Sequence, residues 1–188
     1  RIVMPKIQDI DLTPNPNARK FILKEPITSG VARSYENKED ASSDILASKI
    51  FEFEGITNVF IIDNWITITQ DGSRNWDDLL VEVAQPIREH EPLKIDEVSI
   101  DEPHFNFDDL TEDDKITLDA IQDILDQEIR PYLQADGGDL YIVGFKDKLL
   151  QVHYQGACGS CPSSLTGTLM GIESMVKRVD PEISVTAI

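Results

Sequence analysis

Two cysteines, Cys158 and Cys161, are the residues of this chain whose type and spacing could do chemistry. They form the sequence Cys-Gly-Ser-Cys between a predicted strand and a predicted helix, and Pro162, which suits a first helical turn, follows at once. Thiols at a helix N-terminus lie near unpaired backbone amides and the positive end of the helix dipole, which stabilise thiolate over thiol. Because thiolate is the form that binds metal or attacks a disulfide, the pair predicts metal binding or redox exchange.

One chain offers too few thiolates for a complete metal site. A tetrahedral zinc site and a 4Fe-4S cluster each normally take four cysteine ligands, and the sequence contains only two cysteines. The economical arrangement is a two-fold dimer in which each chain supplies Cys158 and Cys161. Sulfur ligands favour zinc, copper(I) or iron–sulfur over calcium or magnesium, but their softness does not choose among the first three.

Three other interpretations of the pair stay open at this point. A thiol-disulfide oxidoreductase would use Cys158 and Cys161 as a redox pair, although that motif usually stands in a β-α-β unit and here follows a predicted hairpin. A zinc-bridged structural dimer would use the same four thiolates. Two buried structural cysteines are the plainest interpretation, but such residues seldom come as Cys-x-x-Cys at a helix start.

The elements that position the cysteines read helix, strand, strand, helix, strand. Alternating apolar residues predict a hairpin of Tyr141–Phe145 and Leu149–Tyr154, turning at Lys146–Lys148, and a last strand Ile183–Thr186. The first helix is expected to end near Pro131. The apolar faces of the two helices are Leu118, Ile121, Leu125 and Ile129 in the first, and Leu165, Leu169, Ile172, Val176 and Val179 in the second.

The first half of the chain mixes strand and helix signals in the same way. Phe21–Leu23 predicts a strand, and Ile56–Ile62 with Trp65–Gln70 predicts a hairpin turning at Asp63-Asn64. One helix is expected after a cap at Ser42 or Ser43, ending at Gly55, and a second from Trp76, with Pro86 kinking it or lying close to its end. Their apolar faces are Leu46, Ile50 and Phe53, and Trp76, Leu79, Leu80, Val83 and Ile87.

An acidic segment separates the two halves. Residues 96–114 hold nine acidic side chains and no Lys or Arg, a composition that favours an extended linker. Its composition favours a solvated tether, and the alternative is that the apolar Phe105, Phe107 and Leu110, which interrupt it, dock on a domain or a partner. The predicted fold class is therefore α+β, with two small α+β domains at residues 1–92 and 114–188 joined by an acidic linker at residues 93–113.

The charge of the chain excludes several classes of partner. A formal net charge of -18 argues against nucleic acid and anionic lipid, because both bind through Lys and Arg. No apolar run approaches the roughly 20 residues that cross a bilayer, so no membrane association is expected. Two cysteines are too few for a disulfide scaffold and favour a reducing compartment. We expect the cytoplasm of a bacterium, with the mitochondrial matrix as the alternative.

Two segments identify a family. They are Ile129-Arg-Pro-Tyr-Leu-Gln-Ala-Asp-Gly-Gly-Asp139 and Gln155-Gly-Ala-Cys-Gly-Ser-Cys-Pro-Ser-Ser164, which together closely resemble the C-terminal domain of NifU and Nfu proteins. The resemblance spans about residues 114–188. The first half resembles the N-terminal domain of many Nfu proteins through Thr13-Pro-Asn-Pro-Asn17, Gly55-Ile-Thr-Asn-Val-Phe60 and Trp65-Ile-Thr-Ile-Thr69.

This resemblance implies an iron–sulfur cluster carrier. Cys158 and Cys161 would be the ligands of a 4Fe-4S cluster that bridges two subunits, accepted from an assembly scaffold and passed to apo iron–sulfur proteins. The chain would be a homodimer when cluster-bound and a monomer when apo, and no enzyme. A second use of the first domain, as an interaction module, stays open.

No other residues form a recognisable catalytic or metal-binding group. Asp136-Gly-Gly-Asp139 is expected to be a turn that needs positive φ and that shapes the site without ligating it. His90, His104 and His153 lack the spacing of a ligand pair, and His153 is considered only as a residue that tunes the cluster through a hydrogen bond.

Overall fold

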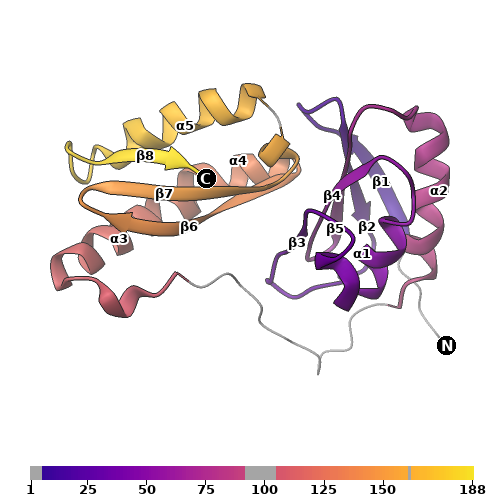
Figure 1. Cartoon of the computed structure of the whole chain (residues 1–188), viewed down its shortest axis with the longest axis horizontal. Helices are drawn as coiled ribbons and strands as arrows, with labels where there is room; N and C mark the ends of the chain where they lie inside the picture. The colour runs from indigo at the N-terminus through magenta and orange to yellow at the C-terminus, as the bar shows by residue number, and fades with distance from the viewer. Residues whose placement is uncertain (1–5, 92–104, 161) are drawn as a thin grey trace. The chain divides into compact units, whose positions relative to one another are not determined.

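The computed structural model of this chain describes residues 6–91, 105–160 and 162–188. These residues fall into two compact units, one within residues 1–102 and one within residues 103–188, called unit 1 and unit 2 below. Each unit combines one sheet with helices (Figure 1), which confirms the predicted class of two small α+β domains. The boundaries of the two domains and of the linker stay predictions, and residues 92–104 of that linker lie outside the described residues.

Unit 1 is a five-stranded antiparallel sheet in the order β1-β2-β5-β4-β3, with two helices packed on one face (Figure 1). Its elements are β1 (Ile7–Leu12), β2 (Ala18–Leu23), β3 (Arg33–Tyr35), α1 (Ile45–Ile50), β4 (Ile56–Ile62), β5 (Trp65–Gln70) and α2 (Trp76–Glu89). The predicted β4–β5 hairpin is confirmed, and Asp63 in its turn has a φ of 49°. The predicted strand Phe21–Leu23 is the second half of β2.

Alternate side chains of the β4–β5 hairpin belong to two different apolar clusters. Val59, Ile61 and Ile66 are fully buried in the main core with α1 and α2. Phe60 and Trp65 lie in a second cluster, with ring centroids 5.4 Å apart. Close to its turn the hairpin is therefore buried and apolar on both faces, while Thr67 and Thr69, on the face of Phe60, are polar but buried as well.

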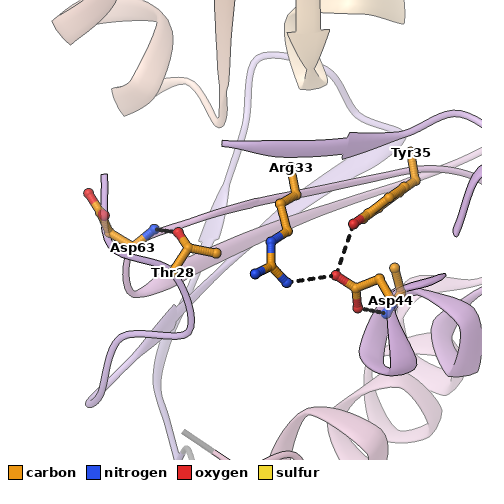
Figure 2. A network of polar contacts seen from close by, with 6 residues as sticks. Thr28, Arg33, Tyr35, Asp44 and Asp63 are labelled. Atoms are coloured by element: carbon orange, nitrogen blue, oxygen red, sulfur yellow. Dashed lines mark hydrogen bonds and ion pairs between the residues drawn. The ribbon is translucent and has the colours of Figure 1, made fainter. Parts of the chain in front are cut away.

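Asp44 connects the edge strand β3 to the start of α1 (Figure 2). Its Oδ2 accepts hydrogen bonds from Arg33 Nη1 at 3.2 Å and from the Tyr35 hydroxyl at 3.0 Å. Its Oδ1 accepts one from the backbone N–H of Ala47 at 2.9 Å, which caps the helix. The expected cap at Ser42 or Ser43 was wrong, because those residues end a separate 3₁₀ turn, Asp40–Ser43, and Asp44 begins the α-helix.

Replacing Asp44 by alanine is expected to lower the free energy of unfolding of unit 1 by about 2–4 kcal/mol. The substitution removes a helix cap, worth about 1 kcal/mol, and leaves Arg33 and Tyr35 without their shared acceptor. Urea unfolding followed by tryptophan fluorescence measures this, because Trp65 and Trp76 both lie in unit 1. Asp40→Ala is the matched control, expected to change stability by less than about 0.5 kcal/mol because Asp40 is exposed. Equal losses in both variants would contradict a special role for Asp44.

Unit 2 is a three-stranded sheet in the order β6-β7-β8 with three helices. Strands β6 and β7 are antiparallel, and β8 runs parallel to β7. Its elements are α3 (Glu112–Ile124), α4 (Arg130–Ala135), β6 (Gly138–Lys146), β7 (Leu149–Gly156), α5 (Pro162–Val176) and β8 (Ser184–Ala187). The predicted hairpin is confirmed, and Asp147 and Lys148 in its turn both have positive φ. The predicted last strand is confirmed with its bounds shifted by one residue.

The helical faces predicted for unit 2 meet in one core. Leu118, Ile121, Leu125 and Ile129 are buried there with Ile172 and Val176, and Leu169 and Val179 pack against them in part. The side chain of Leu165 is not among those described. The expectation that the first helix ends near Pro131 was wrong. A π-helical turn, Leu125–Ile129, follows α3, and Pro131 lies in the first turn of α4. Proline fits there because the first helical N–H groups have no partner within the helix.

The residues just before α3 pack on unit 2. Phe105 and Leu110 lie partly buried against its core, and the ring of Phe107 contacts that of Phe105 at a centroid distance of 5.0 Å. A 3₁₀ turn, Phe107–Asp109, lies between them. The structure therefore shows residues 105–110 docked on a domain and not free as a solvated tether.

Candidate metal site around Cys158

Cys158 lies in a 3₁₀ turn, Ala157–Ser160, that connects the end of β7 to the start of α5. The predicted order of strand, cysteine motif and helix is thus present, and α5 begins at Pro162 as the proline indicated. Cys161 lies outside the described residues. Of the predicted ligand pair the structure therefore places Cys158 alone.

The sulfur of Cys158 is enclosed by unit 2. The residue is 1% exposed and belongs to the same core as Leu133 and Tyr154. Its Sγ lies 4.0 Å from the carbonyl oxygen of Leu133, at the end of α4. On another side it lies against Gly138, where a Cβ atom would come within 2.6 Å of the sulfur. The end of α4 and the turn that follows it therefore surround the thiol, although both are far from Cys158 in the sequence.

The turn from Asp136 to Asp139 is the second of these segments. Gly137 has a φ of 86°, which confirms the expected glycine turn, and its carbonyl oxygen accepts a hydrogen bond from the N–H of Ala157 at 3.1 Å. Gly138 pairs with Gly156 at the open end of the β6–β7 hairpin. The sequence did not predict the contact of Gly138 with Cys158. Its only signal was a pair of adjacent glycines in the same domain as the cysteines.

Asp139 fixes this turn to α4. Its buried carboxylate accepts hydrogen bonds from the backbone N–H of Leu140 at 2.8 Å and from Gln134 Nε2 at 3.2 Å, and Arg130 Nη1 lies 3.7 Å away. Burial raises the pKa of Asp139, and the positive charge of Arg130 opposes that shift. These contacts give the carboxylate a structural task at this turn.

Tyr154 covers the inner side of the turn. It is 4% exposed, and its hydroxyl oxygen has no hydrogen-bond partner among the described residues. Burial, and in second place the charge of Cys158, raise the pKa of Tyr154 to about 12, so the phenol is neutral at physiological pH. Tyr154 is therefore an uncharged neighbour of Cys158 in the core of unit 2.

The contacts given for His153 and His90 are with residues other than Cys158. His153 Nδ1 lies 2.7 Å from the carbonyl oxygen of Ile188, and its ring lies beside that of Tyr141. His90 ends α2 in unit 1, where burial lowers its pKa, and His104 is outside the described residues.

The described residues contain neither a second metal-binding group nor a membrane-spanning helix. No group of three or more His, Cys, Asp or Glu side chains is placed there to hold a metal ion. No helix within residues 6–91, 105–160 and 162–188 is long and apolar enough to cross a membrane.

Comparisons with known proteins match both halves of the chain. The family model described as "Scaffold protein Nfu/NifU N terminal" matches residues 7–92, and the model described as "NifU-like domain" matches residues 121–186. A human protein named "NFU1 iron-sulfur cluster scaffold homolog, mitochondrial" is 31% identical over 172 residues, which are 91% of this chain and 67% of that protein. Its namesake from Drosophila sechellia is 31% identical over the same share of this chain and 60% of its own length. The chain thus spans about two thirds of these relatives.

Two solved structures resemble part of the chain. Protein SAV1430 from Staphylococcus aureus is 27% identical and covers 43% of this chain and 96% of its own, with a TM-score of 0.39. Protein SeR13 from Staphylococcus epidermidis is 28% identical and covers 43% and 92%, with a TM-score of 0.34.

Proposed function

Because this chain belongs to the Nfu/NifU family of scaffold proteins, we propose that it carries an iron–sulfur cluster and transfers it to other proteins. The cluster is its cargo, and the chain itself turns over no substrate. The single observation that carries the proposal is the Cys-x-x-Cys sequence of the NifU-like domain, whose Cys158 lies in the turn before α5, in a chain that contains only two cysteines.

The cargo is a 4Fe-4S cluster held between two subunits. Four cysteine ligands complete such a cluster, and each chain supplies Cys158 and Cys161. A two-fold dimer brings the two pairs together on its symmetry axis. The cluster then holds the dimer, and the chain without cluster is a monomer.

A shared cluster is suited to release. Thiolates of a recipient protein displace one pair of ligands while the other pair still holds the cluster, so no iron becomes free in solution. Each step exchanges one sulfur–iron bond for another, and no electron is transferred. A site with all four cysteines in one chain would hold the cluster against such stepwise exchange for longer.

The partners follow from this role. A cluster-assembling scaffold donates the cluster, and apo iron–sulfur proteins accept it. The names of the relatives, which include the word "mitochondrial", favour the mitochondrion over the bacterial cytoplasm as the compartment. Unit 1 carries no cysteine, so its proposed part in transfer is to recognise partner proteins and not to bind the cluster.

Anaerobic reconstitution with iron and sulfide tests the proposal. We expect broad visible absorbance, four iron atoms for every two chains, and a mass in solution that doubles on loading. The loaded protein should then restore activity to an apo 4Fe-4S enzyme faster than iron and sulfide alone. A colourless monomer with a reversible disulfide would support the oxidoreductase instead, and a colourless dimer that needs zinc would support the structural alternative.

A further inference from the structure

The position of Cys158 is unsuited to a ligand of a shared cluster. With 1% of the residue exposed, a water-sized sphere hardly reaches the sulfur. An iron atom would have to lie at roughly the 2.3 Å of a metal–thiolate bond, and the rest of the cluster would extend beyond it towards the partner chain. Binding therefore requires either Cys158 or the residues around it to move.

Gly138 provides the space in which the sulfur lies. A Cβ atom at this position would come within 2.6 Å of Cys158 Sγ, 3.0 Å of Cys158 Cβ and 2.5 Å of the carbonyl oxygen of Gln155. Gly138 is not among the glycines with positive φ, so its backbone conformation makes no demand for glycine. What requires glycine here is the close approach of two neighbours, the carbonyl oxygen of Gln155 in β7 and the side chain of Cys158.

The turn that carries Cys158 has points at which it can pivot. Gly156, with a φ of 65°, precedes it, and Gly159 lies within it. The N–H of Ala157, the residue just before the cysteine, donates a hydrogen bond to the carbonyl oxygen of Gly137. Rotation at Gly156 and Gly159 would turn the sulfur outward with little change in β7 or α5.

We propose that Gly138 is a positioning residue for Cys158: it leaves the space that holds the sulfur while the chain carries no cluster, and the sulfur leaves this space when the cluster binds. The departure of the sulfur on cluster binding rests on the proposed function, whereas its position in the unloaded chain does not. In the unloaded chain the thiol is protected from oxidants and alkylating agents by the core of unit 2. On transfer, the bond between Cys158 and iron breaks as a recipient thiolate bonds to that iron, and the released sulfur returns to its space.

The test measures the accessibility of one thiol without any iron present. In a Cys161→Ser background Cys158 is the only cysteine, and its rate of alkylation by iodoacetamide is followed by mass spectrometry in native buffer and in urea. We expect the folded protein to react at least about tenfold more slowly than the unfolded one, because reaction requires local opening. Adding Gly138→Ala should remove most of that protection.

Gly144→Ala is the matched control. Gly144 lies on the same strand, and a Cβ there would meet the flexible end of the Gln151 side chain at 2.5 Å, not Cys158. This variant should keep the slow alkylation of its parent. Circular dichroism verifies that all variants are folded before their rates are compared.

Two results would overturn the proposal. The first is alkylation of Cys158 in the folded Cys161→Ser protein at the unfolded rate, and the second is a folded Gly138→Ala variant as protected as its parent. If Gly138→Ala fails to fold, its fraction of folded protein, measured by circular dichroism, is compared with that of the variant that combines Gly138→Ala with Cys158→Ala. Removing the sulfur should then recover part of the loss, and no recovery would count against the proposal.

Reconstitution separates this proposal from the proposed function. The unsubstituted protein, with both cysteines present, is reconstituted with iron and sulfide, while the alkylation rates of the Cys161→Ser proteins are measured without iron. Failure of the unsubstituted protein to load a cluster would refute the carrier function while leaving the thiol result intact.

Discussion

Replacing Cys158 by serine should abolish cluster loading and dimerisation together. In a two-fold dimer one substitution removes two of the four ligands at once, one from each chain. Four-ligand structural metal sites gain about 10–16 kcal/mol, so the loss of half the ligands is expected to weaken binding by more than about a thousandfold. Iron content, visible absorbance and mass in solution after anaerobic reconstitution measure the effect.

The design of this experiment separates a shared cluster from one held in a single chain. His153→Asn is the control near the motif, expected to load normally because His153 Nδ1 contacts the carbonyl oxygen of Ile188 and serves β8. Excess Cys158→Ser protein is then mixed with limiting wild-type protein before reconstitution. A shared site predicts that iron still amounts to four atoms for every two wild-type chains. Four atoms bound by each single wild-type chain would refute the bridging arrangement.

Ile121→Ala should strongly lower the stability of unit 2. Ile121 is fully buried on α3 in the core that also contains Cys158. Truncating a buried isoleucine costs about 2–5 kcal/mol, because apolar contacts are lost and a cavity remains. Domains are stable by about 5–15 kcal/mol in total, so this loss removes a large part of the margin. The enclosure of Cys158 should weaken with it.

The two units can be observed separately in one urea titration. Both tryptophans lie in unit 1, so fluorescence reports on unit 1, while circular dichroism reports on helices in both units. Ile121→Ala should shift a circular dichroism transition and leave the fluorescence midpoint unchanged. Ile116→Ala on the same helix is the control, because Ile116 is 68% exposed and should change stability by less than about 0.5 kcal/mol. A fluorescence midpoint that moves with Ile121→Ala would show that the units unfold as one.

The sequence was sufficient for the elements whose pattern and turns agree. Both hairpins combine alternating or continuous apolar strands with turn residues that tolerate positive φ, such as Asp63 and Asp147. Helix α2 was also clear, because its apolar face repeats every three to four residues and Pro86 lies in its last turn. In each case local preference and tertiary packing favour the same structure.

Other elements could not be read locally. The edge strands β1 and β3 carry polar residues such as Asp9 and Arg33, and only their neighbours in the sheet make them strands. The continuation past Pro131 depends on a π-helical turn that no residue type signals. The enclosure of Cys158 depends on Gly138, twenty residues earlier in the chain, and on the register of β6 with β7, so it emerges only from the assembled fold.

The hydrogen bonds of Asp44 also bear on how the loop before α1 can vary in length. They fix Arg33 and Tyr35 at one end of the loop and Ala47 at the other, while residues 36–40 between them are exposed. Once both ends are held, each doubling of loop length costs only about 0.6 kcal/mol of chain entropy. The bend after Tyr35 is therefore a place where this fold can accept added residues, including a peptide tag, with its sheet and helices unchanged.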